Sequence, residues 1–313
     1  MSLLNLSSAL TAKTALISGA SGFIGSHLSR RLLQIGVEVH GISRSYRPHG
    51  EKDVFWWQGD LADSETIRNI LSTVKPDLIF HLASHVAGSR DLGLVSPTFR
   101  NNLLSTVNLL EVASELGCTR LLLAGSLEEP EPADPQAIPC SPYAAAKWAA
   151  NTYGRMFHQL YQLPVVICRL FMVYGPQQQD LRKLIPYVIL SLFRGDAPQL
   201  MSGERRVDWI YVTDVVEGLL AAAAAKNVEG MTLDIGSGTL TRVRTVVEHL
   251  VTLVNPKIEP CFGALVERPH EQVKAANVQN SLNLLGWQPS IGLKDGLMHT
   301  VDWYVRRAKE GRL

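Results

Sequence analysis

The first half of the chain alternates short apolar, β-branched runs with segments whose apolar residues recur at helical spacing. Alternation of this kind requires right-handed crossovers, which set the strands side by side in a parallel sheet with helices on both faces. The nearly continuous apolar character of the strands fits that burial, so we predict a doubly wound α/β domain. The expected strands are Thr14–Ser18, Glu38–Ile42, Val54–Gln58, Asp77–Leu82, Thr119–Ala124 and Pro164–Leu170. The expected helices between them are Phe23–Ile35, Asp63–Thr73, Asn101–Leu116 and Pro142–Tyr161.

The regular alternation ends near Gly175-Pro176, and mixed helical and extended segments follow. A chain of 313 residues with 46% apolar residues is long enough for one large domain or two closely joined ones. We expect residues 1–175 to form the first domain, with residues 1–12 mobile. Residues 176–313 are expected to form mainly a smaller C-terminal α/β lobe over the carboxyl ends of the strands, with some segments returning to the first domain.

Charge and cysteine usage exclude several classes of protein. The 30 basic and 29 acidic residues leave a net charge of +1, so the chain has no electrostatic footprint for nucleic acid or an anionic membrane. Its four cysteines are scattered and no histidine motif accompanies them, so we expect neither a metal site nor a disulfide scaffold. The sequence shows no signal peptide and no apolar stretch long enough to cross a bilayer, which predicts a cytoplasmic protein.

The sharpest local signal is a glycine-rich run that directly follows a strand and opens a helix. Its first glycine permits a tight turn, the next lets the backbone approach a pyrophosphate, and the last lets helix and strand pack closely. The helix N-terminus adds unpaired N–H groups and a favourable dipole for phosphates. Glycine-rich turns are common, but the strand–turn–helix context predicts that this run binds a dinucleotide. The contacting residues are expected to be Gly19, Ser21, Gly22, Phe23, Ile24 and Gly25.

Residues after the second and third strands bear on the choice of cofactor. An acidic residue commonly binds the ribose 2′-hydroxyl of NAD at the end of the second strand, where this chain has Ser43 and then Arg44. Because a guanidinium can bind a 2′-phosphate, this favours NADP over NAD. The alternative is that Arg44 is only a solvated loop residue, with Arg47 equally available. Asp60 and Leu61, after the third strand, are placed to meet the adenine edge.

Tyr143 and Lys147 lie four residues apart near the start of a helix that Ser141 is expected to cap, so their side chains share one face. A phenolate working at neutral pH needs its pKa lowered by about 3 units, roughly 4 kcal/mol. A lysine ammonium about 4 Å away supplies about that much at an effective dielectric of about 20. Such a pair often arises by chance, but its place after the fifth strand favours proton transfer during hydride transfer over simple packing. Ser126, at the carboxyl edge of the sheet, is placed to hold the reacting oxygen.

A set of motifs, in order along the chain, resembles the extended short-chain dehydrogenase/reductases, and within them the nucleotide-sugar epimerases, dehydratases and reductases. The motifs are T-A-L-I-S-G-A-S-G-F-I-G from Thr14, H-L-A-S from His81, N-L-L-S-T-V-N-L-L-E from Asn102, S-P-Y-A-A-A-K from Ser141, R-L-F-M-V-Y-G-P from Arg169, L-I-P-Y from Leu184, D-W-I-Y-V-T-D from Asp208, R-P-H-E from Arg268 and L-L-G-W-Q-P from Leu284. The resemblance covers nearly the whole chain. It implies a Rossmann-like doubly wound parallel sheet with a smaller C-terminal α/β substrate lobe, NAD(P) as cofactor and a nucleotide sugar as substrate.

The resemblance also assigns roles to single residues. It implies that Ser126, Tyr143 and Lys147 form the catalytic triad, the last two also contacting the cofactor, and that Arg268 contacts the substrate diphosphate. The helices at residues 101–116 and 142–161 often pair with their copies in this family, so we expect a homodimer; a monomer with both helices covered by its own loops is the alternative. Further cofactor contacts are implied for Leu82, Ala83 and Ser84, and further substrate contacts for His85 and Leu184.

Three departures from the family pattern concern the substrate. Met172 stands where an asparagine often contacts the nucleotide sugar, so that contact is lost or made differently. Val207 stands where an arginine is usual, and Arg205 and Arg206 just upstream are the basic side chains that remain for the same phosphates. The V-Y-G that usually follows the catalytic serine is replaced by residues 129–131, Glu-Pro-Glu. We retain Met172, Arg205 and Arg206 as candidate substrate contacts.

Glu128, two residues after Ser126, matches the glutamate with which sugar-nucleotide 4,6-dehydratases remove a proton beside a transient ketone. The same stretch resembles 4-ketosugar reductases, and Leu127 lacks the polar group that some dehydratases place there; Glu128 accepting only backbone hydrogen bonds is the remaining alternative. The resemblance thus implies hydride transfer at a sugar carbon, C4, with Tyr143 as acid/base. It leaves open epimerisation, 4,6-dehydration and NADPH-dependent reduction of a 4-keto sugar. A non-catalytic NAD(P)-sensing protein is the alternative from a different class.

Overall fold

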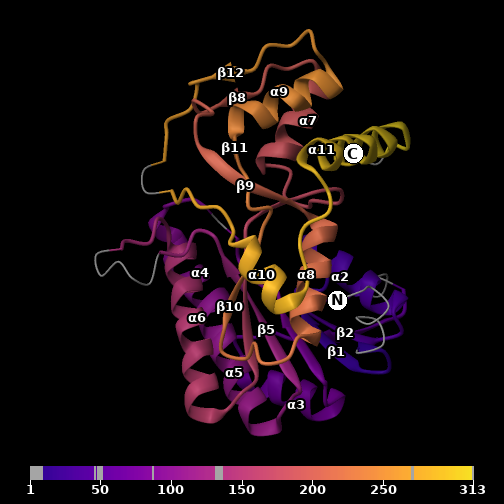
Figure 1. The fold of residues 1–313 in the computed structure, drawn as a ribbon, viewed down its shortest axis with the longest axis vertical. Helices are drawn as coiled ribbons and strands as arrows, with labels where there is room; N and C mark the ends of the chain where they lie inside the picture. Colours follow the sequence, from indigo (N-terminus) through magenta and orange to yellow (C-terminus); the bar gives the residue numbers. More distant parts are fainter. Residues whose placement is uncertain are drawn as a thin grey trace.

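The computed structural model describes residues 10–45, 47, 52–86, 88–130, 137–268 and 271–311. A large sheet with its helices forms one part of the molecule, and a smaller lobe is joined to it (Figure 1). The strands are β1 (Thr14–Ser18), β2 (Glu38–Ser43), β3 (Val54–Gln58), β4 (Leu78–His81), β5 (Arg120–Ser126), β6 (Val165–Leu170), β7 (Met172–Tyr174), β8 (Gln199–Leu200), β9 (Arg206–Tyr211), β10 (Thr232–Ile235), β11 (Leu240–Arg242) and β12 (Cys261–Phe262). The α-helices are α2 (Phe23–Gln34), α3 (Ser64–Val74), α4 (Val95–Thr98), α5 (Ser105–Leu116), α6 (Pro142–Tyr161), α7 (Leu184–Arg194), α8 (Val212–Ala224), α9 (Val243–Val254), α10 (Val278–Leu285) and α11 (Leu293–Lys309).

The large sheet has the strand order β10-β6-β5-β4-β1-β2-β3, and every neighbouring pair in it is parallel. The chain order reverses between β1 and β4, and in open α/β sheets ligands bind at the carboxyl ends of the strands beside such a reversal. The predicted strands Thr14–Ser18 and Val54–Gln58 agree with the observed ones at both ends, and the other four differ by one or two residues. The predicted parallel sheet is confirmed.

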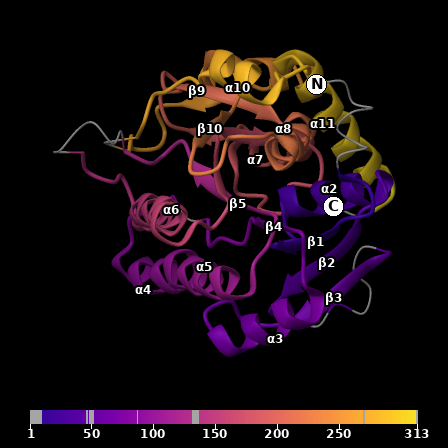
Figure 2. The ribbon, with the colours of Figure 1, turned by 60° about the horizontal axis from the view of Figure 1, so that its bottom comes forward.

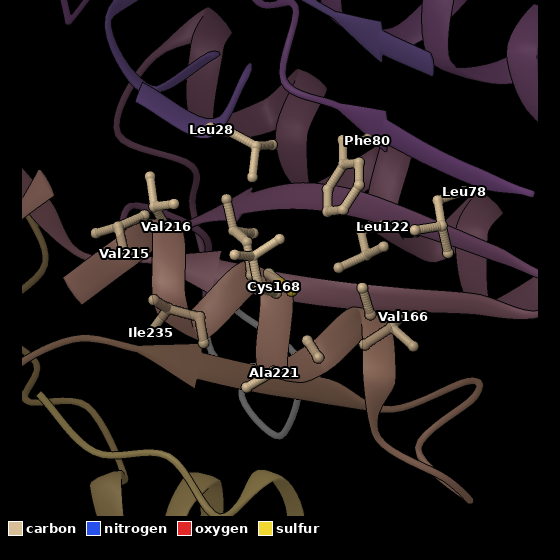
Figure 3. Close-up of a cluster of buried hydrophobic side chains, with 14 of the residues drawn as sticks. Leu28, Leu78, Phe80, Leu122, Val166, Cys168, Val215, Val216, Ala221 and Ile235 are labelled. Atoms are coloured by element: carbon tan, nitrogen blue, oxygen red, sulfur yellow. The ribbon is translucent and has the colours of Figure 1, made fainter. Parts of the chain in front are cut away.

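Helices cover both faces of this sheet (Figure 2). On one face α2 and α8 pack against the strands, and Leu28 and Val215 belong there to the same buried cluster as Leu122 of β5 (Figure 3). On the other face α3, α5 and α6 pack against Leu121 and Leu123 of the same strand. Successive side chains of a strand point to opposite faces, so the apolar run of β5 supplies both cores. The predicted doubly wound α/β domain is therefore confirmed.

The helical region that leads into α5 begins earlier than the sequence pattern indicates. A 3-10 turn at Leu92–Leu94, the short α4 and a π-helical stretch at Phe99–Leu104 run without a break into α5. The predicted start of this helix at Asn101 was wrong. A π-helix has more residues per turn than an α-helix and so changes the spacing of the residues that share one face. The apolar residues before Asn101 therefore do not recur at the spacing of a regular α-helix.

The smaller lobe is built on the three-stranded sheet β11-β9-β7 and the two-stranded sheet β12-β8. Helices α7, α9 and α11 pack around a core of their own with β9. Three later elements return to the large sheet: β10 pairs with β6, α8 packs beside α2, and α10 packs on β10. Conversely, β7 precedes residue 175 but pairs with β9 of the small sheet. A division at residue 175 thus cuts through that small sheet, and the domain limits stay a prediction.

A buried carboxylate fastens the lobe to the end of the large sheet. Asp208 of β9 is 1% exposed and accepts hydrogen bonds from Ser237 N and Oγ, both at 2.7 Å, and from Gly238 N at 2.8 Å. It also accepts one from Ala276 N at 2.9 Å. Ser237 and Gly238 directly follow β10, whereas Ala276 directly precedes the segment of α10. Four accepted hydrogen bonds compensate the burial of this charge, and they hold the lobe at the carboxyl edge of the sheet.

The start of the described chain is packed rather than loose. Leu10 is fully buried, Thr11 Oγ1 donates to Ile35 O at 3.2 Å, and Ala12 N donates to Gly36 O at 3.2 Å. The expectation that residues 1–12 are mobile was therefore wrong for residues 10–12, because an apolar side chain three residues before Lys13 joins the core under α2. Residues 1–9 lie outside the described part of the chain.

Candidate active site

The glycine-rich run forms a turn that no larger residue could adopt in place. Gly19 has φ +77°, and a Cβ there would lie 2.7 Å from Ala83 N. A Cβ on Gly25 would lie 2.1 Å from Gly19 O, so α2 crosses directly over the turn. Gly22 precedes α2 without a side-chain cap, which leaves the first N–H groups of the helix, those of Phe23 and Ile24 among them, without a partner inside the helix. The cradle fits the pyrophosphate of a dinucleotide.

Ser21 joins this loop to the segment that enters the smaller lobe. Its carbonyl oxygen accepts a hydrogen bond from Gln179 Nε2 at 2.6 Å. On the same side, His27 of α2 hydrogen-bonds Pro176 O at 3.1 Å. The lobe therefore reaches over the predicted phosphate loop, and a ligand bound there would contact both parts of the molecule.

At the end of β2 the residues predicted to face the ribose lie among arginines. Ser43 Oγ accepts a hydrogen bond from Arg47 Nε at 3.2 Å, and Arg44 donates to Asn101 Oδ1 at 3.1 Å. Asp60 is held by Arg100 at 2.8 Å, and a hydrogen bond from the backbone of Ala62 followed by that from Arg100 lowers the pKa of its carboxyl. Leu61 beside it is buried. This edge therefore presents guanidinium groups and no acidic side chain at the end of β2 itself.

The segment after β4 closes the other side of the predicted cofactor site. His81 hydrogen-bonds Ser18 Oγ at 2.7 Å and Thr106 Oγ1 at 2.9 Å, and burial lowers the pKa of its imidazole to about 3, so it is a neutral structural group. Leu82 N donates to Ser18 O, and Asn102 holds the backbone of His85 through both its amide atoms.

Two side chains of this segment have buried polar atoms that no neighbour satisfies. Ser84 Oγ and His85 Nδ1 have no hydrogen-bond partner among the described residues. Buried polar groups in folded proteins are nearly always paired. Their position at the carboxyl end of β4 therefore suits them to a ligand, as the sequence predicts for Ser84 and for His85.

Ser126, Tyr143 and Lys147 meet where β5 ends and α6 begins. Ser141 caps α6 as predicted, accepting a hydrogen bond from Ala144 N at 3.1 Å. The Ser126 hydroxyl lies close enough to the Tyr143 phenol to lower its pKa. Lys147, one helical turn on, is 5% exposed and donates to Ala124 O of β5 at 2.8 Å. The structure thus brings together the three residues that the sequence predicts as a catalytic triad.

The charges around Tyr143 differ from those that the sequence suggests. Burial raises the pKa of the Tyr143 phenol above its usual range, the hydrogen bond from Ser126 opposes this rise, and the Glu128 and Glu129 carboxylates add to it. Burial also lowers the pKa of Lys147 to about 8, while Glu129 acts to raise it. Lys147 is not among the groups that shift the pKa of Tyr143, so the lowering that the sequence suggests for this pair is not seen in the protein alone.

The backbone hydrogen bond that the sequence offered as the alternative role of the Glu128 carboxylate is made by the Glu129 carboxylate. Glu128 N donates to Ser126 Oγ at 3.2 Å, and its half-buried carboxylate accepts a hydrogen bond from Cys140 Sγ at 3.7 Å. Glu129 instead accepts a backbone hydrogen bond, from Ser126 N at 2.5 Å, and two contacts of 2.6 Å from Asn151 Nδ2. Residue 131 of this loop lies outside the described residues.

Sequence reasoning missed Glu129 and Asn151 as members of the site. One signal was available, since Asn151 follows Lys147 by four residues and so lies on the same face of α6. The reverse turn that folds Glu129 back onto Ser126 has no comparable signature in the sequence.

The substrate contacts proposed in the lobe are brought together only in part. Arg205 Nη1 and Arg268 Nη1 approach Glu271 at 3.0 and 3.8 Å, and a Cβ on Gly88 would lie 3.3 Å from Arg268 Nη1. Arg268 therefore faces the segment after β4, and Arg205 shares the carboxylate of Glu271 with it. Arg206 does not join Arg205 and Arg268. It is the exposed first residue of β9 and pairs in register with Arg242 of β11. Side chains alternate between the two faces of a strand, and that of Arg206 points to solvent.

Met172 and Leu184 are the remaining candidates for substrate contact. Met172 of β7 is half-buried and packs against the cores of both parts, and Leu184 is the first residue of α7. Within the described residues no three His, Cys, Asp or Glu side chains gather as a metal site. In the same part of the chain, no helix combines the length and apolar character needed to span a membrane.

A parallel sheet with a glycine cradle at its switch point and a Ser–Tyr–Lys triad at the next strand end defines a dinucleotide-dependent oxidoreductase of the short-chain dehydrogenase type. Residues 15–236 match the model of the NAD dependent epimerase/dehydratase family. The chain belongs to this family and is an enzyme of the extended short-chain dehydrogenases. The alternative of a non-catalytic NAD(P) sensor is therefore set aside.

Known proteins of several activities are similar over the whole chain. A UDP-glucose 4-epimerase of Mycolicibacterium smegmatis is 30% identical over 94% of this chain and 99% of its own. A dTDP-D-glucose 4,6-dehydratase of Mus musculus is 26% identical over 94% of this chain and 89% of its own. The solved structure of MoeE5 in complex with UDP-glucuronic acid and NAD superposes with a TM-score of 0.83 at 28% identity, covering 94% of this chain and 99% of that one.

Proposed function

We propose that the enzyme acts on a nucleotide sugar and changes the oxidation state of the sugar at C4, either transiently during the reaction or permanently in the product. The observation that carries this proposal is the meeting of Ser126, Tyr143 and Lys147 beside the glycine cradle of Gly19 to Gly25. Relatives with this sequence pattern include an epimerase and a dehydratase of sugar nucleotides. Arg205 and Arg268, which both approach Glu271, are suited to a diphosphate.

Ser126, Tyr143 and Lys147 have different roles in the reaction at the sugar carbon. When bound, the nicotinamide accepts and returns a hydride and brings a positive charge beside the sugar. The Ser126 hydroxyl, which lies close to the Tyr143 phenol, holds the sugar oxygen. Tyr143 takes the proton from that oxygen as the alcohol becomes a ketone, and returns it in the reverse step. Lys147, anchored to Ala124 O, holds its ammonium below the phenol and stabilises the phenolate.

Two outcomes follow from this common step, and Glu128 bears on the choice. Its carboxylate lies close enough to Tyr143 to raise the pKa of the phenol. A carboxylate in that place can remove the proton beside a ketone at C4, which is the step that distinguishes 4,6-dehydration from epimerisation. Leu127, which is buried, contributes no polar group to that step. We therefore take epimerisation as the first candidate and dehydration as the second.

We further infer that NADP is used in preference to NAD. Arg44, Arg47 and Arg100 gather at the end of β2, and the Asp60 carboxylate is already bonded to Arg100. A 2′-phosphate would find two or more guanidinium groups there. The described cysteines are all free, which supports a reducing compartment such as the cytoplasm as the location.

A panel of UDP-, GDP-, dTDP- and CDP-sugars, incubated with the purified protein and either NAD or NADP, tests these proposals together. We expect one sugar nucleotide to give a product of unchanged mass without net nicotinamide consumption, and NADP to support the faster rate. Loss of water would select dehydration, and Glu128→Gln is then expected to lower kcat about 100-fold or more because it removes a general base. Stoichiometric NADPH oxidation on a 4-keto sugar would instead select a reductase. Absence of turnover with every sugar nucleotide would refute the proposed substrate class.

We also propose that two copies of the chain pair through α4, the π-helical stretch and α6. A groove of about 630 Å³ runs between these helices, with Val95, Phe99, Leu103 and Ala149 among its lining residues. Val95 and Phe99 are 46% and 54% exposed, and an apolar surface of this kind marks an interaction site. A second copy supplies a matching apolar surface by two-fold symmetry.

Light scattering is expected to give a mass in solution twice the 34.5 kDa of one chain. Phe99→Glu should lower it towards one chain, because it places a charge in the groove, whereas Tyr161→Glu at the far end of α6 should not. A wild-type mass of one chain would contradict the pairing.

A further inference from the structure

Glu129, which lies against Asn151 of α6, is a buried carboxylate that has no part in the proposed reaction. Glu129 is 6% exposed and Asn151 is 1% exposed. Asn151 Nδ2 lies 2.6 Å from both oxygens of Glu129, and Ser126 N donates to Glu129 Oε1 at 2.5 Å. Gly125 makes room for the pair, since a Cβ there would lie 2.8 Å from Asn151 Nδ2 and 3.0 Å from Glu129 Oε1.

The partners of Glu129 identify its charge state. The backbone N–H of Ser126 and the amide of Asn151 are both donors, so the hydrogen bonds around Glu129 suit an ionised carboxylate that only accepts. Burial raises the pKa of the Glu129 carboxyl, while the hydrogen bonds from Asn151 and Ser126 and the charges of Lys147 and Arg169 act to lower it.

A buried carboxylate costs several kcal/mol of desolvation. A neutral glutamine could accept the same hydrogen bond from Ser126. The hydrogen bond to Ser126 alone therefore does not explain why residue 129 is a glutamate rather than a neutral glutamine.

The reason lies in the groups around Lys147. Its ammonium is buried between β5 and α6, and Asn151, which holds Glu129, lies one helical turn further along the same face of α6. Glu129 acts to raise the pKa of Lys147, whereas His81 on β4 is neutral. Arg169 on β6, which also acts on Glu129, is paired with Asp234 at 2.7 Å. Among the described residues Glu129 is thus the counter-charge that acts on Lys147, and it is bonded to the backbone of Ser126 as well.

We propose that Glu129, held by Asn151, is a positioning residue: it fixes Ser126 through its N–H group and supplies the negative charge that keeps Lys147 an ammonium below Tyr143. Its consequence for catalysis rests on the proposed function, whereas its effect on Lys147 does not. One carboxylate in this arrangement serves two of the three members of the triad. Glu129 is almost fully covered, by Asn151 of α6 and the backbone at the end of β5, so it acts through Ser126 and Lys147 rather than by touching substrate or cofactor.

The charge on Lys147 can be measured without any substrate. In protein labelled with [13C]lysine, the Cε resonance of Lys147, assigned by its loss in Lys147→Arg, reports the protonation midpoint during a pH titration. The midpoint is expected at about 8 in the wild type. Glu129→Gln is expected to lower it by about one pH unit or more, because an opposite charge favours the charged form. The control Glu259→Gln, which removes an exposed carboxylate in the smaller lobe, is expected to leave the midpoint unchanged.

A rescue separates charge from simple packing. In the double variant Glu129→Gln/Asn151→Asp, the glutamine oxygen still accepts from Ser126 N and its amide donates to the new aspartate, so both hydrogen bonds return with the charge moved onto α6. The Lys147 midpoint is expected to return to within about half a pH unit of the wild-type value. Where Glu129→Gln alone does not fold, the double variant still tests the proposal: a Lys147 midpoint well below the wild-type value would contradict it, because the restored charge would then have failed to act on Lys147.

The kinetic readout is the pH profile of kcat on the sugar nucleotide that the panel identifies. Glu129→Gln is expected to lower kcat about tenfold or more with little change in KM. The deficit should be largest between its own Lys147 midpoint and that of the wild type, where only the wild-type lysine is charged. An unchanged Lys147 midpoint in folded Glu129→Gln would overturn the proposal, and so would an unchanged kcat. If the wild type turns over no sugar nucleotide, the proposed function fails and the titration still decides the role of Glu129.

Discussion

Tyr143→Phe is expected to lower kcat by a factor of about 10² to 10⁴, the usual contribution of a positioned general acid–base group, while cofactor and substrate affinity change only a few-fold. The substitution removes one oxygen atom and leaves the ring. Lys147 stays bonded to Ala124 O, and Ser126 stays at the end of β5. The variant therefore loses the group that exchanges a proton with the sugar oxygen and little else. Steady-state kinetics on the sugar nucleotide found by the panel, with a separate titration of NADPH fluorescence, measure the two effects independently.

Tyr153→Phe is the matched control for this substitution. Tyr153 lies on the same helix α6, is 40% exposed, and its loss of a hydroxyl should leave kcat within about twofold, as for most surface substitutions. If Tyr143→Phe retains more than about a tenth of the wild-type kcat, another group moves the proton, and Glu128 is the first to examine because its carboxylate lies close to the phenol.

The same site shows why a tyrosine acid/base depends on its ligands. In the protein alone, burial and the carboxylates of Glu128 and Glu129 favour the protonated phenol. Lys147, with its pKa lowered to about 8, is still mostly an ammonium at neutral pH. The charge balance at Tyr143 therefore favours proton release only when a further positive charge arrives beside it, which couples proton transfer to the presence of the oxidised cofactor. Sequence spacing alone suggests a permanently lowered pKa, because it registers the lysine but not the burial or the neighbouring carboxylates.

Features that depend on local pattern could be predicted from the sequence. Strands such as Val54–Gln58 and the helix Pro142–Tyr161 were found to the residue because their apolar periods and the cap at Ser141 are encoded in neighbouring positions. The glycine turn and the meeting of Ser126, Tyr143 and Lys147 could be expected for a related reason, since strand ends in a parallel sheet meet at one edge, whereas the roles of these residues in binding and catalysis stay predictions.

Features that depend on the path of a loop or an irregular helix could not be predicted in this way. The π-helical stretch at Phe99–Leu104 hid the start of its helix, and the alternation of β9 turns Arg206 away from Arg205. The neighbouring glutamates Glu128 and Glu129 are equivalent in sequence, and only the turn after β5 decides which of them is buried against Asn151.

Gly25→Ala is expected to weaken cofactor binding about 100-fold or more, roughly 2.7 kcal/mol, and to lower the melting temperature. A Cβ at residue 25 would lie 2.1 Å from Gly19 O and 2.8 Å from Ala20 Cα, and both of these are backbone atoms that no side-chain rotation can move. Relief requires α2 to move away from the turn, at a cost of about 1–3 kcal/mol for overpacking. Such a movement also carries the N–H groups of Phe23 and Ile24 away from the phosphates they are expected to bind. Fluorescence titration with NADPH measures the affinity, and thermal unfolding without ligand measures the stability.

Gly292→Ala is the control that separates the crowded position from glycine replacement in general. Gly292 also lies at the start of a helix, with φ −64°, and a Cβ there would have its nearest contact at 3.6 Å, an ordinary distance. Its replacement should leave affinity within about twofold, as expected for a surface substitution without strain. Wild-type affinity in Gly25→Ala would show that the pyrophosphate does not bind at this turn. A lowered melting temperature with unchanged affinity would show that the close approach of α2 to β1 serves folding alone, and the cofactor site would then have to be sought away from the helix N-terminus.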